Sequence, residues 1–147
     1  MINKMLVAID GSDHSKKAVD YASEIAASLK ATLIILYVVK AQEIPKGLRE
    51  YADLEHIPGL DIDILKKVAG DLVANTQRRA KEKGVGDVVG EVEEGPIART
   101  IVARAKHHDA DMIVVGSRGL GNIEATLRGG VSHRVELLAK CQVLTVR

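Results

Sequence analysis

The chain has 147 residues, the size of one ordinary domain, and its 21 Lys and Arg residues against 20 Asp and Glu leave a formal net charge of +1. This balance excludes the chain-wide cationic surface that binds nucleic acids non-specifically. Apolar residues make up 46% and charged residues 28%, as in a globular domain, and because Phe and Trp are absent the core has to be aliphatic.

The first predicted element is a continuous apolar run at 5–9 that stops at Asp10, which indicates a strand buried on both faces of a parallel sheet. Ser12 or Asp13 then caps a helix. Its apolar positions recur at helical spacing, at Ala18, Ala22, Ile25, Ala26 and Leu29. A second buried strand is predicted at 32–39, so the chain begins with a strand–helix–strand unit.

Residues 40–61 contain two Pro and two Gly without a sustained period, which predicts a long excursion; whether it folds over the site as a lid stays open. An amphipathic helix follows and ends before Gly84. Its apolar stripe comprises Ile62, Leu65, Ala69, Leu72, Val73, Thr76 and Ala80. The alternation of apolar and polar residues at 87–94 predicts a less buried edge strand. Gly95 and Pro96 then open a third helix, with Pro96 in its first turn.

A fourth strand is predicted at 111–115, and a glycine-rich segment follows it. The last helix carries Val131, Val135 and Leu138 inward, and the last strand covers 142–146. Strands that alternate with helices in this way predict a single α/β domain spanning 1–147. We expect an open, five-stranded, mostly parallel sheet with helices on both faces.

No run of residues resembles a signal peptide or a membrane span, so we expect a cytoplasmic protein without a membrane anchor. The single cysteine, Cys141, excludes an internal disulfide and a cysteine-based metal cluster. The five histidines have no partners at the spacing of metal ligands, so no metal site in the protein itself is predicted.

Ligands of such sheets bind beyond the carboxyl ends of the strands, where the strand order reverses. The residues of interest are therefore Asp10, Val38 and the segment that starts at Gly116. Glycines in that segment allow close approach of the main chain to a ligand, and the amino end of the last helix favours anions. Neither the dinucleotide fingerprint nor a Walker loop is present, which argues against a redox cofactor and a P-loop ATPase.

Several stretches together carry a family resemblance. They are Val7-Ala8-Ile9-Asp10-Gly11-Ser12 with Ser15, Leu36-Tyr37-Val38-Val39, Val115-Gly116-Ser117-Arg118-Gly119, Val131-Ser132 and Cys141-Gln142-Val143-Leu144-Thr145-Val146. In order and spacing, over the whole chain, they resemble the universal stress protein family. Nucleotide-binding members of that family carry Gly-x2-Gly-x9-Gly followed by Ser or Thr, and Gly116, Gly119 and Gly129 match this spacing.

The resemblance implies that the domain binds ATP or a related adenine nucleotide, with any Mg²⁺ held mainly through the phosphates. It implies that Asp10, with the strand end at Ala8 and Ile9, contacts the nucleoside and that the main chain of Val38 meets the adenine edge. On the ribose and phosphate side it implies Val115, Gly116, Arg118 and Gly119. At the phosphates it implies Gly129, Gly130, Val131 and Ser132.

One residue departs from the family pattern, because Gly130 stands where Ser or Thr is expected. The main-chain donor remains, but one hydroxyl donor to phosphate is lost. A hydrogen bond to a charged group contributes about 1.5–3 kcal/mol, and about 1.4 kcal/mol is tenfold in affinity. The sequence therefore predicts weakened phosphate binding, and it leaves the preferred nucleotide open.

The favoured interpretation is an adenine-nucleotide-binding stress-response regulator or sensor with at most slow ATP hydrolysis, since no base beside the phosphates is evident. We expect a homodimer that pairs the edge strand at 142–146, as the family does. The alternative is a nucleotide-free protein-interaction module of the same fold. In that case Asp10 only caps a helix, and the glycines only shape a tight turn.

Overall fold

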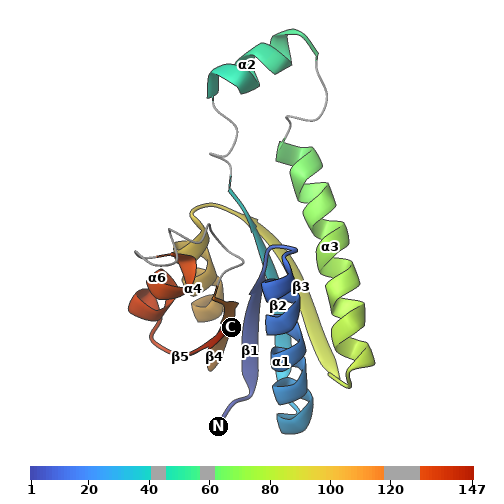
Figure 1. The fold of residues 1–147 in the computed structure, drawn as a ribbon, viewed down its shortest axis with the longest axis vertical. Helices are drawn as coiled ribbons and strands as arrows, with labels where there is room; N and C mark the ends of the chain where they lie inside the picture. The colour runs from blue at the N-terminus through green and yellow to red at the C-terminus, as the bar shows by residue number, and fades with distance from the viewer. Residues whose placement is uncertain (41–45, 57–61, 118–129) are drawn as a thin grey trace.

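Five parallel strands form one sheet in the order β3-β2-β1-β4-β5 (Figure 1). This computed structural model describes residues 1–40, 46–56, 62–117 and 130–147. The strands are β1 (Lys4–Ile9), β2 (Thr32–Val39), β3 (Asp87–Glu94), β4 (Met112–Gly116) and β5 (Gln142–Val146). The predicted open five-stranded sheet is confirmed, and β3 is an edge strand as its alternating sequence indicates.

Helices cover both faces of the sheet, as predicted. On one face lie α1 (Asp13–Leu29) and α3 (Ile62–Glu82), which contact each other, and on the other lie α4 (Ile97–His107) and α6 (Val131–Leu138) (Figure 1). The two helices of the first face are joined by a bidentate ion pair. In it Arg79 donates to both carboxylate oxygens of Asp20 at 2.8 Å.

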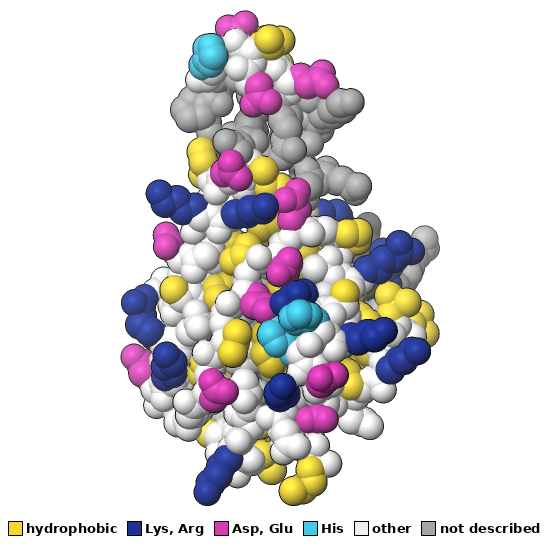
Figure 2. Space-filling model, turned by 180° about the vertical axis from the view of Figure 1, so that it is seen from behind, with side chains coloured by type: hydrophobic (Ala, Val, Ile, Leu, Met, Phe, Trp, Pro, Cys, Tyr) yellow, Lys and Arg dark blue, Asp and Glu magenta, His cyan; other side chains and the backbone are white. Residues whose placement is uncertain are grey.

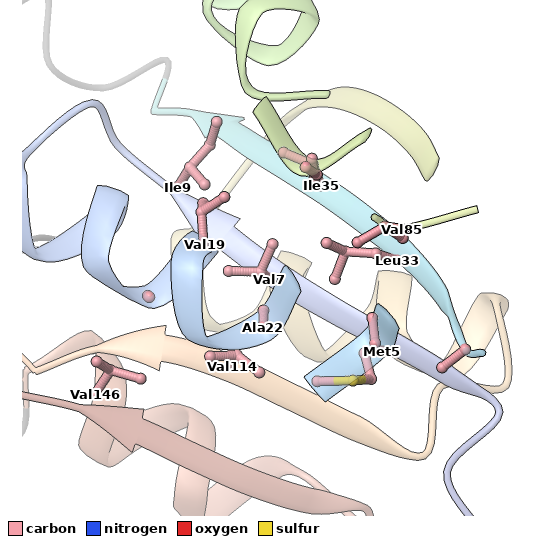
Figure 3. Close-up of a cluster of buried hydrophobic side chains, with 14 of the residues drawn as sticks. Met5, Val7, Ile9, Val19, Ala22, Leu33, Ile35, Val85, Val114 and Val146 are labelled. Atoms are coloured by element: carbon pink, nitrogen blue, oxygen red, sulfur yellow. The ribbon is translucent and has the colours of Figure 1, made fainter. Parts of the chain in front are cut away.

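The core consists of two aliphatic clusters, one on each face of the sheet, because side chains alternate along a strand. Along β1, Met5, Val7 and Ile9 pack beneath α1 and α3 (Figure 3). Leu6 and Ala8 pack on the opposite face against α4 and α6. This alternation explains the continuous apolar run, since neither face of the central strand is exposed to water.

Asp111 fastens the start of β1 to the turn before β4. Its Oδ2 accepts hydrogen bonds from the main-chain N–H groups of Asn3 at 2.8 Å and Lys4 at 3.1 Å. These two bonds hold the pKa of the Asp111 carboxyl below its ordinary value. The start of β1 is thereby placed in register, with Met5 opposite Met112 of β4.

The structure corrects three details of the sequence-based expectations. The excursion at 40–61 contains a helix, α2 (Lys46–Leu54), that the sequence analysis did not predict. Helix α4 begins at Ile97, so Pro96 is its N-cap rather than a residue of its first turn. Leu29 and Leu138 are about half exposed, because each is the last residue of its helix. Within the described residues, no helix is long and apolar enough to cross a membrane.

Candidate functional site

The candidate site lies at the carboxyl edge of the sheet, between β1 and β4. The chain builds the sheet outward from β1 through β2 to β3, and then returns to the other side of β1 to add β4 and β5. The strand order therefore reverses between β1 and β4, which is where ligands bind in open parallel sheets. Asp10 follows β1 directly and Gly116 ends β4, so both predicted residues lie at this reversal (Figure 1).

The turn from β1 to α1 is held by hydrogen bonds that start at Asp10. Oδ1 of Asp10 accepts from the N–H of Ser12 at 2.9 Å, and the N–H of Asp10 donates to Oγ of Ser15 at 3.1 Å. Ser12 is the N-cap of α1, and its Oγ accepts from the N–H of Ser15 at 3.2 Å. Between them Gly11 has a φ of +86°, a conformation that other residues adopt at a cost. Asp10 therefore shapes the turn, whereas the cap of α1, which the alternative interpretation gave to Asp10, is Ser12.

Gly116 brings the end of β4 against the first turn of α1. A Cβ atom on Gly116 would lie 3.1 Å from the main-chain oxygen of His14. Beyond it, the N–H of Ser117 donates to the carbonyl of Val146 at 2.8 Å, so β4 and β5 stay paired up to the edge. A side chain at residue 116 would therefore require the first turn of α1 to move by a few tenths of an ångström.

Four of the predicted contacts have buried side chains, at Ala8, Ile9, Val38 and Val115. All four belong to the core clusters, Ile9 on the face covered by α1 and α3 and the other three on the opposite face. The last residue pair of β1 and β2 is Ile9 with Tyr37, and Val38 is the next residue of β2. Because these side chains fill the core, contact between these residues and a ligand is restricted to their main chain.

The amino end of α6 is the remaining described part of the predicted site. Gly130 is the N-cap, with φ −57° and ψ 176°, and as a glycine it makes no side-chain cap hydrogen bond. Val131 opens the helix, and Ser132 is buried with 9% of its surface exposed. The first N–H groups of a helix have no partner within it, so this end retains donors for an anion. Arg118, Gly119 and Gly129 lie outside the described residues.

The sequence analysis did not identify a polar cluster that lies along β3, at one side of the sheet. Arg104 of α4 donates to both oxygens of Glu91 on β3, at 2.7 and 3.0 Å, and His108 Nε2 lies 2.7 Å from Glu91 Oε1. Figure 2 shows histidine side chains beside acidic and basic ones on this face. The residues are 13 and 17 positions apart, so no local motif could have indicated the cluster. All three side chains are partly buried where α4 packs beside β3, and the Arg104 guanidinium offsets the charge of the Glu91 carboxylate.

The comparison with protein families decides between the possible assignments of this fold. A model described as the universal stress protein family matches residues 1–147. The chain belongs to the universal stress protein family. This confirms the resemblance drawn from its sequence motifs.

Curated relatives agree with this assignment. Universal stress protein YxiE of Bacillus subtilis (strain 168) is 38% identical over 152 residues, which cover 100% of both chains. A universal stress protein of Methanocaldococcus jannaschii is 33% identical over 147 residues, which cover 100% of this chain and 83% of that protein. In both cases the similarity extends along the whole of this chain.

Solved structures of the family share the fold. A crystal structure of a universal stress protein in complex with cAMP has a TM-score of 0.72 and 30% identity, over 99% of this chain and 97% of that one. Universal stress protein UspA from Lactobacillus plantarum has a TM-score of 0.78 and 26% identity, over 99% and 98%. The first of these shows that some members of the family bind an adenine nucleotide.

Proposed function

We propose that this universal stress protein binds an adenine nucleotide at the carboxyl edge of β1, β2 and β4 and serves as a stress-response regulator or sensor. The observation that carries the proposal is the position of Asp10 and Gly116 at the ends of the adjacent strands β1 and β4, where the strand order reverses. The cAMP complex of a relative that is 30% identical supports the class of ligand. We expect at most slow ATP hydrolysis, since the residues described at this edge include no evident base on the phosphate side to activate a water molecule.

The described residues fit the three parts of such a ligand. The main chain of Val38 would meet the adenine edge, and the Asp10 carboxylate would accept a hydrogen bond from the nucleoside. The main chain at Gly116, together with the uncapped amino end of α6 at 130–132, would receive the phosphates. From the sequence, the complete set of phosphate-side residues also includes Arg118, Gly119 and Gly129. Mg²⁺ would be held mainly by the phosphates.

Calorimetric titration with ATP, ADP, AMP and cyclic AMP, with and without Mg²⁺, tests the proposal. We expect saturable binding of at least one of these ligands, and a loss of about tenfold or more in affinity for Asp10→Ala. Asp13→Ala is the matched control, because it removes the same charge from a fully exposed side chain three residues along. Its affinity should equal that of the unaltered protein.

Absence of binding to all four ligands would refute the proposal and favour the nucleotide-free interaction module. Equal losses of affinity for Asp10→Ala and Asp13→Ala would refute the placement of the nucleoside at Asp10. Rapid release of pyrophosphate from ATP would instead indicate an adenylating enzyme.

We also propose that two copies pair through β5. The two edges of the sheet differ, since β3 carries the acidic residues Asp87, Glu91, Glu93 and Glu94, whereas β5 reads Gln-Val-Leu-Thr-Val. Beside β5, Leu137 of α6 is 72% exposed. An apolar edge strand at one end of a sheet offers its free main-chain groups to a second strand.

Size-exclusion chromatography with light scattering tests the pairing. We expect about twice the chain mass of 15.8 kDa. A monomer at micromolar concentration would show that β5 stays unpaired.

A further inference from the structure

The β1–α1 turn contains a buried serine that the proposed nucleotide site does not use directly. Ser15 is only 3% exposed, yet its Oγ accepts the hydrogen bond from the N–H of Asp10. A side chain that is buried in this way has no surface for a ligand. Its hydroxyl oxygen instead holds the main chain of Asp10, the residue whose carboxylate is the candidate ligand contact.

The hydrogen bonds of the turn form a closed circuit. Ser15 Oγ holds the N–H of Asp10, Asp10 Oδ1 holds the N–H of Ser12, and Ser12 Oγ holds the N–H of Ser15. One carboxylate oxygen of Asp10 is thereby occupied within the turn. Among the hydrogen bonds of the described residues, none is made by the second oxygen, Oδ2.

The circuit ties Asp10 to a rigid element. Ser15 lies in the first turn of α1, and α1 is seated on the central core cluster through Ala18, Val19 and Ala22. A carboxylate anchored in this way loses little freedom when it accepts a hydrogen bond from a ligand, so more of that bond's energy contributes to affinity.

We propose that Ser15 is a positioning residue that fixes the Asp10 carboxylate for nucleoside recognition. The inference rests on the proposed nucleotide-binding function and adds to it a residue that never touches the ligand. If so, replacing Ser15 weakens the binding of the nucleoside in a protein that has Asp10, and has little effect in a variant that lacks Asp10.

A double-mutant cycle tests the inference on the full-length protein. Ser15→Ala, Asp10→Ala and the double variant are each titrated with ATP and with AMP. We expect Ser15→Ala to weaken binding by about three- to tenfold, the effect of one neutral hydrogen bond. In the Asp10→Ala background the same substitution should change affinity less than twofold, because the group that Ser15 positions is gone.

Ser23→Ala is the matched control. Ser23 is another buried serine of α1, at 0% exposure, and its Oγ has no hydrogen-bond partner in the structure. It should bind both ligands like the unaltered protein, which separates positioning from a general effect of removing a hydroxyl from α1. Ser15→Thr retains the hydroxyl, and Ser15 lies beside a small pocket between α1 and α3 that Leu72 and Thr76 also line. We expect Ser15→Thr to restore most of the affinity.

The outcomes separate this inference from the proposed function. If the unaltered protein binds neither ATP nor AMP, the proposed function fails and the inference fails with it. If it binds, and Ser15→Ala binds as tightly while Asp10→Ala does not, the inference alone is overturned. Additive losses in the cycle would also overturn it, since Ser15 would then act independently of Asp10. Circular dichroism melting of each variant checks that a lost affinity does not come from unfolding.

Discussion

The contact between α3 and β3 is close enough to require a glycine at residue 90. Gly90 lies on β3 opposite Ile35 of β2, and α3 passes over it. A Cβ atom at this position would lie 2.6 Å from Cγ1 of Val73 and would also meet the side-chain amide of Gln77. The amide is the end of a flexible side chain and can move aside. Val73 is 4% exposed and stiff at χ1, so it cannot move without displacing α3.

Gly90→Ala should therefore destabilise the protein. Overpacking of a core by one methyl group costs about 1–3 kcal/mol. Replacing glycine in a strand returns about 0.5–1 kcal/mol, because alanine loses less backbone freedom on folding. The difference lies between about 0 and 2.5 kcal/mol and centres near 1 kcal/mol, which lowers Tm by about 2–4 °C for a chain of this size.

Gly70→Ala is the matched control, since the same substitution falls on α3 itself at a position where an added Cβ meets nothing within 4 Å. It should stabilise the protein by about 0.5–1 kcal/mol, as alanine does for glycine within a helix. Thermal melting and urea unfolding of both variants give the comparison. If Gly90→Ala melts at or above the temperature of the unaltered protein, the close packing of α3 on β3 is wrong.

Three further predictions concern the core, the polar cluster and the site. Ser23→Ala should raise the free energy of unfolding in urea by about 1 kcal/mol, because it removes a buried hydroxyl that has no hydrogen-bond partner among the described residues. A lower free energy of unfolding would contradict this, since it would mean that the hydroxyl has such a partner. Burial raises the pKa of Glu91, but hydrogen bonds from Arg104 and His108 outweigh it and hold that pKa below its ordinary value. Its stabilisation is then present above the unfolded-state pKa of about 4.3 and is lost as pH falls through the lower folded-state pKa. Glu91→Gln should accordingly cost more stability in urea at pH 7 than at pH 3, and an equal cost would contradict the assignment. Gly130→Ser restores a hydroxyl at the N-cap of α6 and should tighten ATP about tenfold or more by calorimetry; unchanged affinity would place the phosphates elsewhere.

The sequence predicted the strands well because each is marked by a pattern that depends on neighbouring residues alone. The apolar run of β1 and the alternation of β3 differ, and they correspond to a central strand and an edge strand. Helix α2 was missed although Leu48, Tyr51 and Leu54 recur at a helical spacing in it. The Pro and Gly residues on both sides of this short segment favoured a loop over the whole stretch.

The candidate site was only partly accessible to the same reasoning. Asp10 and Gly116 were found because they lie at the ends of buried strands, and Gly130 because it follows the last glycine of the family's pattern, at the amino end of the last helix. The positioning role of Ser15 could be inferred only from the hydrogen-bond distances around the turn. In the sequence, a serine five residues after Asp10 looks like part of an ordinary helix start.

The sequence by itself determined the elements, the two-faced burial of the central strands and the family, since these follow from local periodicity and from motifs at fixed spacing. The strand order 3-2-1-4-5, the approach of Gly116 to His14 and the joining of Glu91 to Arg104 and His108 were decided only by the tertiary structure. They depend on which strands pair and which helices pack across the sheet. Such contacts join residues that are distant in the chain, and they leave no periodic trace in it.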